Sequence, residues 1–354
     1  MLGRNLKLRL RASRIERSGV RKKDTRLRRW SLVLLAAREM KVVVAGSASS
    51  PSTCTYVGEG TARRCRRFWA CPNSKQVKAQ LYLCHGTHEH SGRYDKLAAA
   101  FGAVGVEVHA VDFSGHGSSA GERGDFGTVE GAVSDVIALV QDTARASLPL
   151  IVLGHSLGSM MAMIVAHRLA SSPSLPRPAM VVLSGFAMDS ISPPFGLKFL
   201  IPVLRAMPSV IRAICAQLAK TQPTGPAAPI PSPSELTSFP ERAADKWADP
   251  LNYHGWIQNR TALALLDMRA TCQALLPHFG SAVSGTSFPF LLVHGGADEL
   301  CPRSACDALM AKSPQPDKEM RVFAGLLHEV LDAEEARQHV VEWCRARIGP
   351  RCRL

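Results

Sequence analysis

Short apolar runs alternate with longer amphipathic segments along most of this chain of 354 residues. An apolar run without polar positions at every second residue is typical of a strand buried on both faces of a parallel sheet. In the longer segments apolar residues recur every three or four positions, which predicts helices with one buried face. The predicted strands are 77–84, 104–111, 148–153, 180–183, 288–293 and 319–323, and the predicted helices are 95–101, 128–146, 160–170, 261–276, 303–312 and 332–348. Repeated strand–helix units favour a mostly parallel sheet with helices on both faces.

The alternation stops after Ser184 and a proline-rich stretch follows, before the rhythm returns. An irregular insertion at this point predicts a helical cap over the carboxyl ends of the strands, where ligands bind in such sheets. At the other end, the short mixed segment 54–72 is compatible with a hairpin. We therefore expect a basic leader, a core in two parts and a cap between them, with the bounds 1–40 for the leader, 41–187 and 258–354 for the core, and 188–257 for the cap.

The net charge of +14 lies mainly in the leader, because residues 1–41 contain fourteen Lys and Arg against three acidic residues. An Arg-rich, acid-poor leader is typical of a transit peptide, a surface-binding arm or solvated disorder. A further interpretation is that translation begins at Met40 and that the leader results from an upstream start codon. The rest of the chain is nearly neutral, so we expect no nucleic-acid partner. The prediction is a cytoplasmic or peripheral membrane protein, with organellar targeting by residues 1–39 as the alternative.

Ten cysteines are scattered along the chain without a C-x-x-C pair. In a chain of this length such spacing indicates reduced thiols of an intracellular protein. The apolar run 30–37 is too short to span a bilayer, and no other stretch reaches the required length. These observations predict a soluble or peripherally attached protein.

The pentapeptide 154–158, Gly-His-Ser-Leu-Gly, joins a predicted strand to a predicted helix. The pattern G-x-S-x-G in that context predicts a nucleophile elbow with Ser156 at its tip, and an ordinary glycine-bracketed turn is the alternative. Glycines are expected at both ends of the pentapeptide because strand and helix pack too closely for a Cβ atom. The backbone N–H of Leu157, at the start of the helix, is a predicted oxyanion donor.

A serine hydroxyl becomes a useful nucleophile when a base accepts its proton and a carboxylate orients that base. Asp298 and His328 each follow a predicted strand, and both lie downstream of Ser156 in the order that α/β-hydrolases use. We predict Ser156 as nucleophile, His328 as general base and then acid, and Asp298 as the orienting carboxylate. Glu299, the neighbour of Asp298, is the alternative carboxylate.

The second oxyanion donor is expected in the loop that begins at His85, where the backbone N–H of Thr87 is the candidate. Histidine is a common metal ligand, and this loop contains three, His85, His88 and His90. Three histidines so close together on one loop give poor tetrahedral geometry, and the predicted reaction needs no metal. We therefore expect neither a metal nor a cofactor.

Five ordered motifs carry a resemblance to a known family. They are His-Gly-x-x-Glu-His-Ser-Gly-Arg-Tyr at 85–94, Asp-x-x-Gly-His-Gly-x-Ser at 112–119, Gly-His-Ser-Leu-Gly at 154–158, Gly-x-Ala-Asp-x-Leu-Cys at 295–301 and Gly-x-x-His at 325–328. Over about residues 75–348 the chain resembles a monoacylglycerol lipase. The resemblance implies an α/β-hydrolase that cleaves a monoacylglycerol to a fatty acid and glycerol through an acyl-enzyme.

Two positions bear on how far this resemblance extends. His88 stands where the family usually has a second glycine, which affects the shape of the oxyanion loop. Cys301 matches a cysteine that the family carries beside the catalytic acid, and is either a reactive thiol or an inert, partly buried one.

Within the predicted cap, the segment 194–220 is nearly all apolar apart from four basic residues spaced seven or eight apart, Lys198, Arg205, Arg212 and Lys220. Such spacing places the charges on one narrow helical stripe. One interpretation is a lid that lines an acyl channel and touches a lipid surface; the other is a cap helix packed on the core. Both favour long acyl chains, so the expected partner is an acylglycerol or another lipid ester, with peripheral membrane contact through the cap.

Two further functions remain open. The first is a related carboxylesterase acting on lysophospholipids or phenolic esters. The plant-like segment from Asp249 to Thr261 supports this alternative. The second is a non-catalytic ligand-binding member of the fold. A pure binding protein has no need of Ser156, Asp298 and His328 in register, which argues against this second function.

Overall fold

The computed structural model describes residues 41–43, 52–73, 76–189, 207–281 and 287–348. Nine strands form one sheet in the order β1-β2-β3-β5-β4-β6-β7-β10-β11, and the six strands from β5 to β11 in that order are parallel to one another. Their bounds are Lys41–Val43 (β1), Ser52–Val57 (β2), Arg64–Trp69 (β3), Ala79–Cys84 (β4), Val106–Val111 (β5), Leu150–His155 (β6), Pro178–Ser184 (β7), Phe290–Gly295 (β10) and Lys318–Phe323 (β11). Each predicted strand is present, and the predicted fold class is confirmed.

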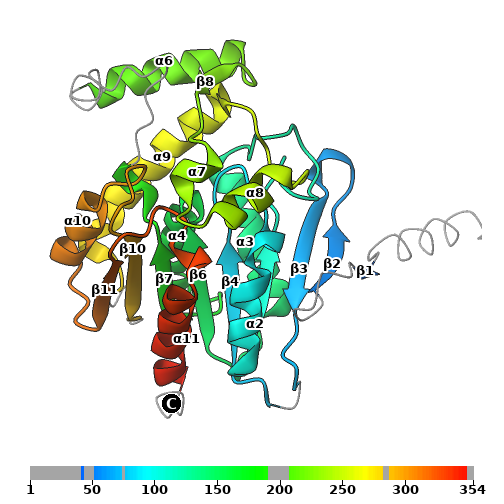
Figure 1. Cartoon of the computed structure of the whole chain (residues 1–354), viewed down its shortest axis with the longest axis vertical. Coiled ribbons are helices and arrows are strands. Elements are labelled where there is room, and N and C mark those ends of the chain that lie inside the picture. The colour runs from blue at the N-terminus through cyan, green and yellow to red at the C-terminus, as the bar shows by residue number, and fades with distance from the viewer. Residues whose placement is uncertain (1–40, 44–51, 74–75, 190–206, 282–286, 349–354) are drawn as a thin grey trace, which may run out of the picture. The chain divides into compact units, whose positions relative to one another are not determined.

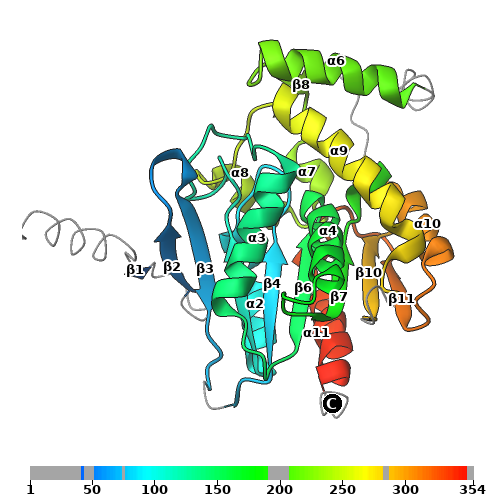
Figure 2. The ribbon, with the colours of Figure 1, turned by 180° about the vertical axis from the view of Figure 1, so that it is seen from behind.

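Helices cover the sheet on both faces (Figures 1 and 2). One face carries α3 (Val129–Thr143), α4 (Leu157–Ser171), α9 (Asn259–Leu275) and α10 (Ser304–Lys312), and the other carries α2 (Asp95–Ala103) and α11 (Glu334–Ile348). Strands β4, β5, β6 and β10 are buried along their whole length, as expected for strands between two helical layers. The short 3-10 helices are Gly60–Ala62 (η1), Ser91–Tyr94 (η3), Ala187–Asp189 (η4), Leu276–His278 (η7) and Val330–Asp332 (η8).

The predicted N-terminal hairpin is present as β2 and β3, which pair antiparallel. Burial alternates along β3, as expected for a strand with one covered face. The hairpin joins the parallel part of the sheet where β3 pairs with β5. Antiparallel strands therefore lie only at this edge of the described sheet.

Between β7 and α9, the described part of the predicted cap contains three short helices and a small two-stranded ribbon. They are α6 (Pro208–Thr221), β8 (Pro226–Ala228), α7 (Pro233–Leu236), α8 (Pro240–Ala248) and β9 (Ile257–Gln258). Each helix begins with proline, which suits the first turn because its missing N–H would have no partner there. Three of the prolines that obscured a helical rhythm in the sequence are thus helix starts, and a fourth, Pro226, begins β8.

Some of the predicted features fall outside the described ranges. The leader 1–40, its apolar run 30–37, and the basic residues Lys198 and Arg205 are among them. In the part of the chain that the structure does describe, no helix is both long enough and apolar enough to cross a membrane. None of the nine cysteines in these ranges forms a disulfide bond.

Candidate active site

Ser156 lies at the turn between β6 and α4, with backbone angles of φ 56° and ψ −125°. This left-handed conformation is uncommon for a residue with a side chain, and in a nucleophile elbow it exposes the serine hydroxyl. The flanking glycines make the turn possible. A Cβ atom on Gly154 would lie 1.9 Å from the carbonyl oxygen of Gly158, and one on Gly158 would lie 2.0 Å from that of Cys84. The close packing expected from the pentapeptide is present.

His328 and Asp298 come together at the ends of β11 and β10. His328 Nδ1 lies 2.8 Å from Asp298 Oδ2, and both side chains are buried. The other carboxylate oxygen of Asp298 accepts hydrogen bonds from the backbone N–H groups of Leu300 and Cys301 at 3.0 and 2.9 Å. Glu299, the alternative carboxylate, is exposed.

The charge states of this pair follow from its contacts. Burial raises the pKa of Asp298, but the hydrogen bond from His328 and that from the Cys301 N–H outweigh it, and the net shift is downward. Burial lowers the pKa of His328, whereas Cys301 and Asp298 raise it, and the net shift is upward. His328 Nε2 has no hydrogen-bond partner among the described residues. It is therefore available for proton transfer with a group in the pocket.

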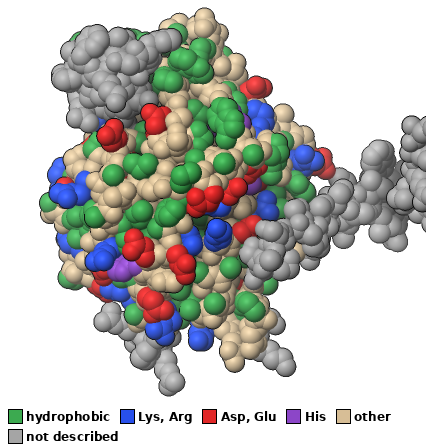
Figure 3. Space-filling view, viewed as in Figure 1, with side chains coloured by type: hydrophobic (Ala, Val, Ile, Leu, Met, Phe, Trp, Pro, Cys, Tyr) green, Lys and Arg blue, Asp and Glu red, His purple; other side chains and the backbone are tan. Residues whose placement is uncertain are grey.

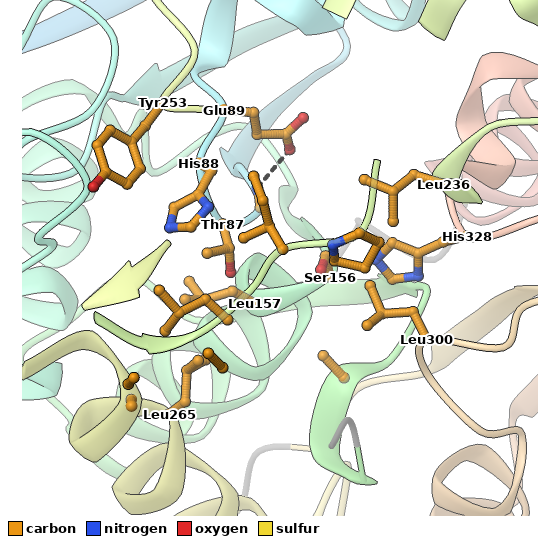
Figure 4. A pocket seen from close by; sticks show the side chains of 18 of the residues that line it. Thr87, His88, Glu89, Ser156, Leu157, Leu236, Tyr253, Leu265, Leu300 and His328 are labelled. Carbon is orange, nitrogen blue, oxygen red and sulfur yellow. Dashed lines mark hydrogen bonds between the residues drawn. The ribbon is translucent and has the colours of Figure 1, made fainter. Parts of the chain in front are cut away.

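Ser156 and His328 line the same pocket (Figure 4). The structure thus brings the three predicted triad residues to the carboxyl ends of three parallel strands. This is the edge of the sheet at which open α/β folds bind their ligands.

Both predicted oxyanion donors lie beside Ser156 in the fold. Leu157 is the first residue of α4, so its N–H has no acceptor within the helix. Thr87 follows Gly86, at which a Cβ atom would lie 3.2 Å from the Cβ of Ser156. The loop after β4 therefore runs directly over the nucleophile.

Glu89 holds this loop in place. Its Oε1 accepts hydrogen bonds from the Gly86 N–H and the Tyr94 hydroxyl, both at 2.6 Å, and its Oε2 accepts one from Arg93 at 3.2 Å. Glu89 is 2% exposed. Burial raises its pKa, but the neighbouring cations Lys246, His155 and Arg93 outweigh burial and hold the pKa below its ordinary value. Glu89 thus orients the His85–Gly86 peptide, one residue before the predicted donor N–H of Thr87.

A buried charge network behind the nucleophile was not anticipated from the sequence. Lys246 of α8 forms an ion pair with Glu329 and lies 3.9 Å from Glu89 Oε2. Glu329 Oε2 is also 3.1 Å from His155 Nε2. The network joins the cap to the residues next to Ser156, His328 and the oxyanion loop. Its members are far apart in the sequence: Glu89 and His155 belong to two separate motifs, whereas Lys246 and Glu329 belong to none.

The pocket has a volume of about 430 Å³ and is lined mainly by apolar side chains from the cap, α9 and the elbow (Figure 4). Among these are Leu157, Met188, Ile211, Ile214, Leu218, Ile230, Leu236, Ile257, Leu265, Leu266 and Leu300. Its polar lining includes Ser156, His328 and the oxyanion loop, and also Asn259 and Arg269 of α9. An apolar chain with one polar end matches this lining.

The histidine-rich loop has protein partners for two of its three rings. His85 Nε2 accepts a hydrogen bond from the Phe113 N–H at 3.0 Å, and His90 Nε2 lies 2.8 Å from Asp249 Oδ2. In the described ranges, Asp298, Cys301 and His328 are the group whose ligand atoms lie close enough for a metal ion. Its carboxylate and imidazole atoms already bond to each other, so the group is accounted for without an ion.

The comparison with known protein families decides the classification. The family model described as serine aminopeptidase, S33, matches residues 75–335. This chain belongs to that family. The matched region contains every residue that the sequence placed in the candidate site.

Two similar relatives are lipases. The chain is 30% identical over 295 residues to a monoacylglycerol lipase of Mycolicibacterium smegmatis, covering 82% of this chain and 94% of the relative. It is 28% identical over 301 residues to the monoglyceride lipase of Rattus norvegicus, with coverage of 81% and 89%. Among solved structures, a monoacylglycerol lipase of Paleococcus ferrophilus has a TM-score of 0.65 and 25% identity, covering 80% of this chain and 98% of its own.

These similarities make the chain an α/β-hydrolase of the monoacylglycerol lipase type and a carboxylic ester hydrolase. The resemblance inferred from the five motifs is confirmed at this level.

Proposed function

We propose that this protein hydrolyses monoacylglycerols to a fatty acid and glycerol through an acyl-enzyme. The observation that carries the proposal is that Ser156 and His328 line the same apolar pocket, with Asp298 hydrogen-bonded to His328. The carbonyl carbon of a bound ester can reach Ser156 while its acyl chain lies against the apolar wall.

In the first half-reaction, Ser156 Oγ attacks the ester carbonyl carbon as His328 Nε2 accepts the hydroxyl proton. The N–H groups of Thr87 and Leu157 stabilise the negative charge that develops on the carbonyl oxygen. The C–O bond to glycerol then breaks, and glycerol leaves with the proton from His328. In the second half, His328 deprotonates a water that attacks the acyl carbon, and the fatty acid leaves as Ser156 is protonated again. Asp298 keeps the His328 ring oriented throughout.

The segment 249–261, which supports the phenolic-ester alternative in the sequence, connects the cap and α9 to the core in the structure. Asp249 pairs with His90 at 2.8 Å, Arg260 pairs with Asp125 at 2.9 Å, and Thr261 donates a hydrogen bond to the Gly124 carbonyl at 3.0 Å. These contacts attach the cap and α9 to the loops of the core. They give no separate support to a phenolic substrate.

The direct test compares a 2-monoacylglycerol, a lysophosphatidylcholine of the same acyl chain and a phenolic ester. We expect the purified protein to release fatty acid from the monoacylglycerol with the highest kcat/KM. If the lysophospholipid or the phenolic ester were preferred by about tenfold or more, the proposed substrate would be wrong although the hydrolase would stand.

The raised pKa of His328 predicts an alkaline-shifted pH profile. A protonated His328 cannot accept the Ser156 proton, so kcat/KM rises as the pH passes the pKa of His328. We expect the midpoint of this rise above the ordinary histidine value of about 6.5. Because Cys301 contributes to the upward shift, Cys301→Ala should move the midpoint to lower pH, whereas Cys344→Ala on α11 should not. Identical profiles for all three proteins would contradict this assignment.

We also propose that α6 touches the lipid surface. Met207, Val210, Ile214 and Leu218 are between 38% and 51% exposed along one side of it, and Figure 3 shows hydrophobic side chains over this helix. An exposed apolar stripe of this kind suits the membrane interface. Ile214 and Leu218 also line the pocket, so the stripe continues into the substrate site.

A double substitution tests this contact. Met207→Asp with Val210→Asp should reduce sedimentation with phosphatidylcholine vesicles severalfold, because two charges replace apolar side chains of the stripe. Hydrolysis of a short soluble ester should persist, because neither residue lines the pocket. Ala146→Asp with Ser147→Asp, two exposed positions between α3 and β6, adds the same charge elsewhere. Equal vesicle binding by both double variants would exclude α6 as the contact.

A further inference from the structure

His88 combines two features that destabilise the folded state. Its φ of 62° lies in the left-handed region, which residues other than glycine adopt rarely. Its side chain is 4% exposed, yet neither ring nitrogen has a hydrogen-bond partner among the residues that the structure describes. Buried polar atoms are normally paired, and backbone strain gathers at functional sites. A bound ligand that hydrogen-bonds to the ring would account for both features.

The ring of His88 is held in a defined position on the pocket wall. It packs edge-on against Tyr253, with ring centroids 4.9 Å apart, and lies nearly parallel to His116 at 6.3 Å. The carbonyl oxygen of His88 accepts a hydrogen bond from the Tyr253 N–H at 3.0 Å. Figure 4 shows the ring in the pocket next to Thr87, the predicted oxyanion donor. An imidazole with two unpaired ring nitrogens therefore lines the pocket one residue away from the predicted oxyanion donor.

The environment keeps this imidazole neutral. Burial is the main cause, and His116, Lys246 and His254 add to it, so that the pKa of His88 is well below its ordinary value. A neutral imidazole has one donor and one acceptor nitrogen. A hydroxyl group can satisfy either nitrogen, whereas a phosphate only accepts.

We propose that His88 hydrogen-bonds a free hydroxyl of the leaving alcohol and so selects polyol esters over esters of simple alcohols. The inference rests on the proposed function and names a specificity residue for it. The leaving oxygen and the oxyanion are attached to the same carbonyl carbon, and Thr87 is adjacent to His88 in the chain. A glycerol hydroxyl is therefore within the neighbourhood of the ring when the carbonyl lies over Ser156.

The test compares a monoacylglycerol with the propyl ester of the same fatty acid, which lacks the two hydroxyls. Glycine adopts left-handed backbone freely and asparagine tolerates it, so His88→Gly and His88→Asn suit the loop. We expect His88→Gly to lower the ratio of the two kcat/KM values about tenfold, mainly through the monoacylglycerol, since one hydrogen bond to a neutral partner is lost. His88→Asn should retain most of the ratio, because its amide also donates and accepts.

Equal losses on both esters would show that His88 only shapes the oxyanion loop and would overturn the inference, as would an unchanged ratio. Should His88→Gly fail to fold, the ring can be followed directly. In Ser156→Ala protein with ¹⁵N-labelled histidine, the His88 signals, assigned by their loss in His88→Asn, should shift with the monoacylglycerol and not with the propyl ester. No difference between the two esters would refute the contact.

Failure of the proposed function would look different. The protein with His88 intact would then hydrolyse the propyl ester or a lysophosphatidylcholine but not the monoacylglycerol, and the variants at position 88 would not change that order.

Discussion

Ser156→Ala is expected to lower kcat for every ester substrate by about 10⁵-fold, because the remaining oxyanion donors and binding contacts cannot replace the nucleophile. The substitution removes one oxygen from a side chain that lines the pocket. The free energy of unfolding should therefore change by less than about 1 kcal/mol. Measured kcat/KM and urea denaturation of the same preparation separate the two effects.

A matched serine controls for the substitution itself. Ser174 is exposed in the connection between α4 and β7, and Ser174→Ala should retain full activity. A fluorophosphonate probe, which labels activated serines, should modify the wild type and the Ser174 variant but not the Ser156 variant. Hydrolysis within about tenfold of the wild type by Ser156→Ala would exclude Ser156 as the nucleophile.

Sequence patterns predicted the sheet well because the signals for its strands are local. An apolar run such as 150–153 in β6 is identifiable without its neighbours, and strand, tight turn and helix around Ser156 lie within one short segment. The order of Asp298 and His328 after Ser156, each at a strand end, identifies both residues, and the structure places His328 Nδ1 2.8 Å from Asp298 Oδ2. Parallel topology explains this, since it aligns the ends of strands that are distant in sequence.

The charge network could not be predicted in the same way. Lys246 lies on a helix of the cap, and its partners Glu89 and Glu329 belong to two loops of the core. No periodicity relates three such positions, because tertiary packing alone decides which buried charges meet. His88 illustrates the same limit: the sequence identified a departure from glycine, while the unpaired ring nitrogens became apparent only with the fold.

Gly158→Ala should destabilise the protein by more than about 4 kcal/mol, an exceptional value for the addition of one methyl group. The new Cβ would lie 2.0 Å from the carbonyl oxygen of Cys84 and 2.5 Å from that of His85. Both obstacles are backbone atoms, so no change of side-chain rotamer relieves the clash. The chain can respond only by moving α4 away from the end of β4.

This movement also predicts a loss of activity in whatever fraction still folds. His85 precedes the oxyanion loop, so displacement of its carbonyl separates Thr87 from Leu157, and loss of an oxyanion donor costs about 10²–10³ in kcat. Gly127→Ala is the matched control. Gly127 has φ 79°, and an added methyl group there would have no neighbouring atom within 4 Å, so backbone strain alone should cost about 1–2 kcal/mol without affecting kcat.

Urea denaturation and kcat for both glycine variants thus distinguish steric exclusion from backbone strain. A Gly158 variant as stable and active as the Gly127 variant would mean that the elbow has room for a side chain. The close approach of α4 to β4 would then no longer account for the second glycine of the pentapeptide.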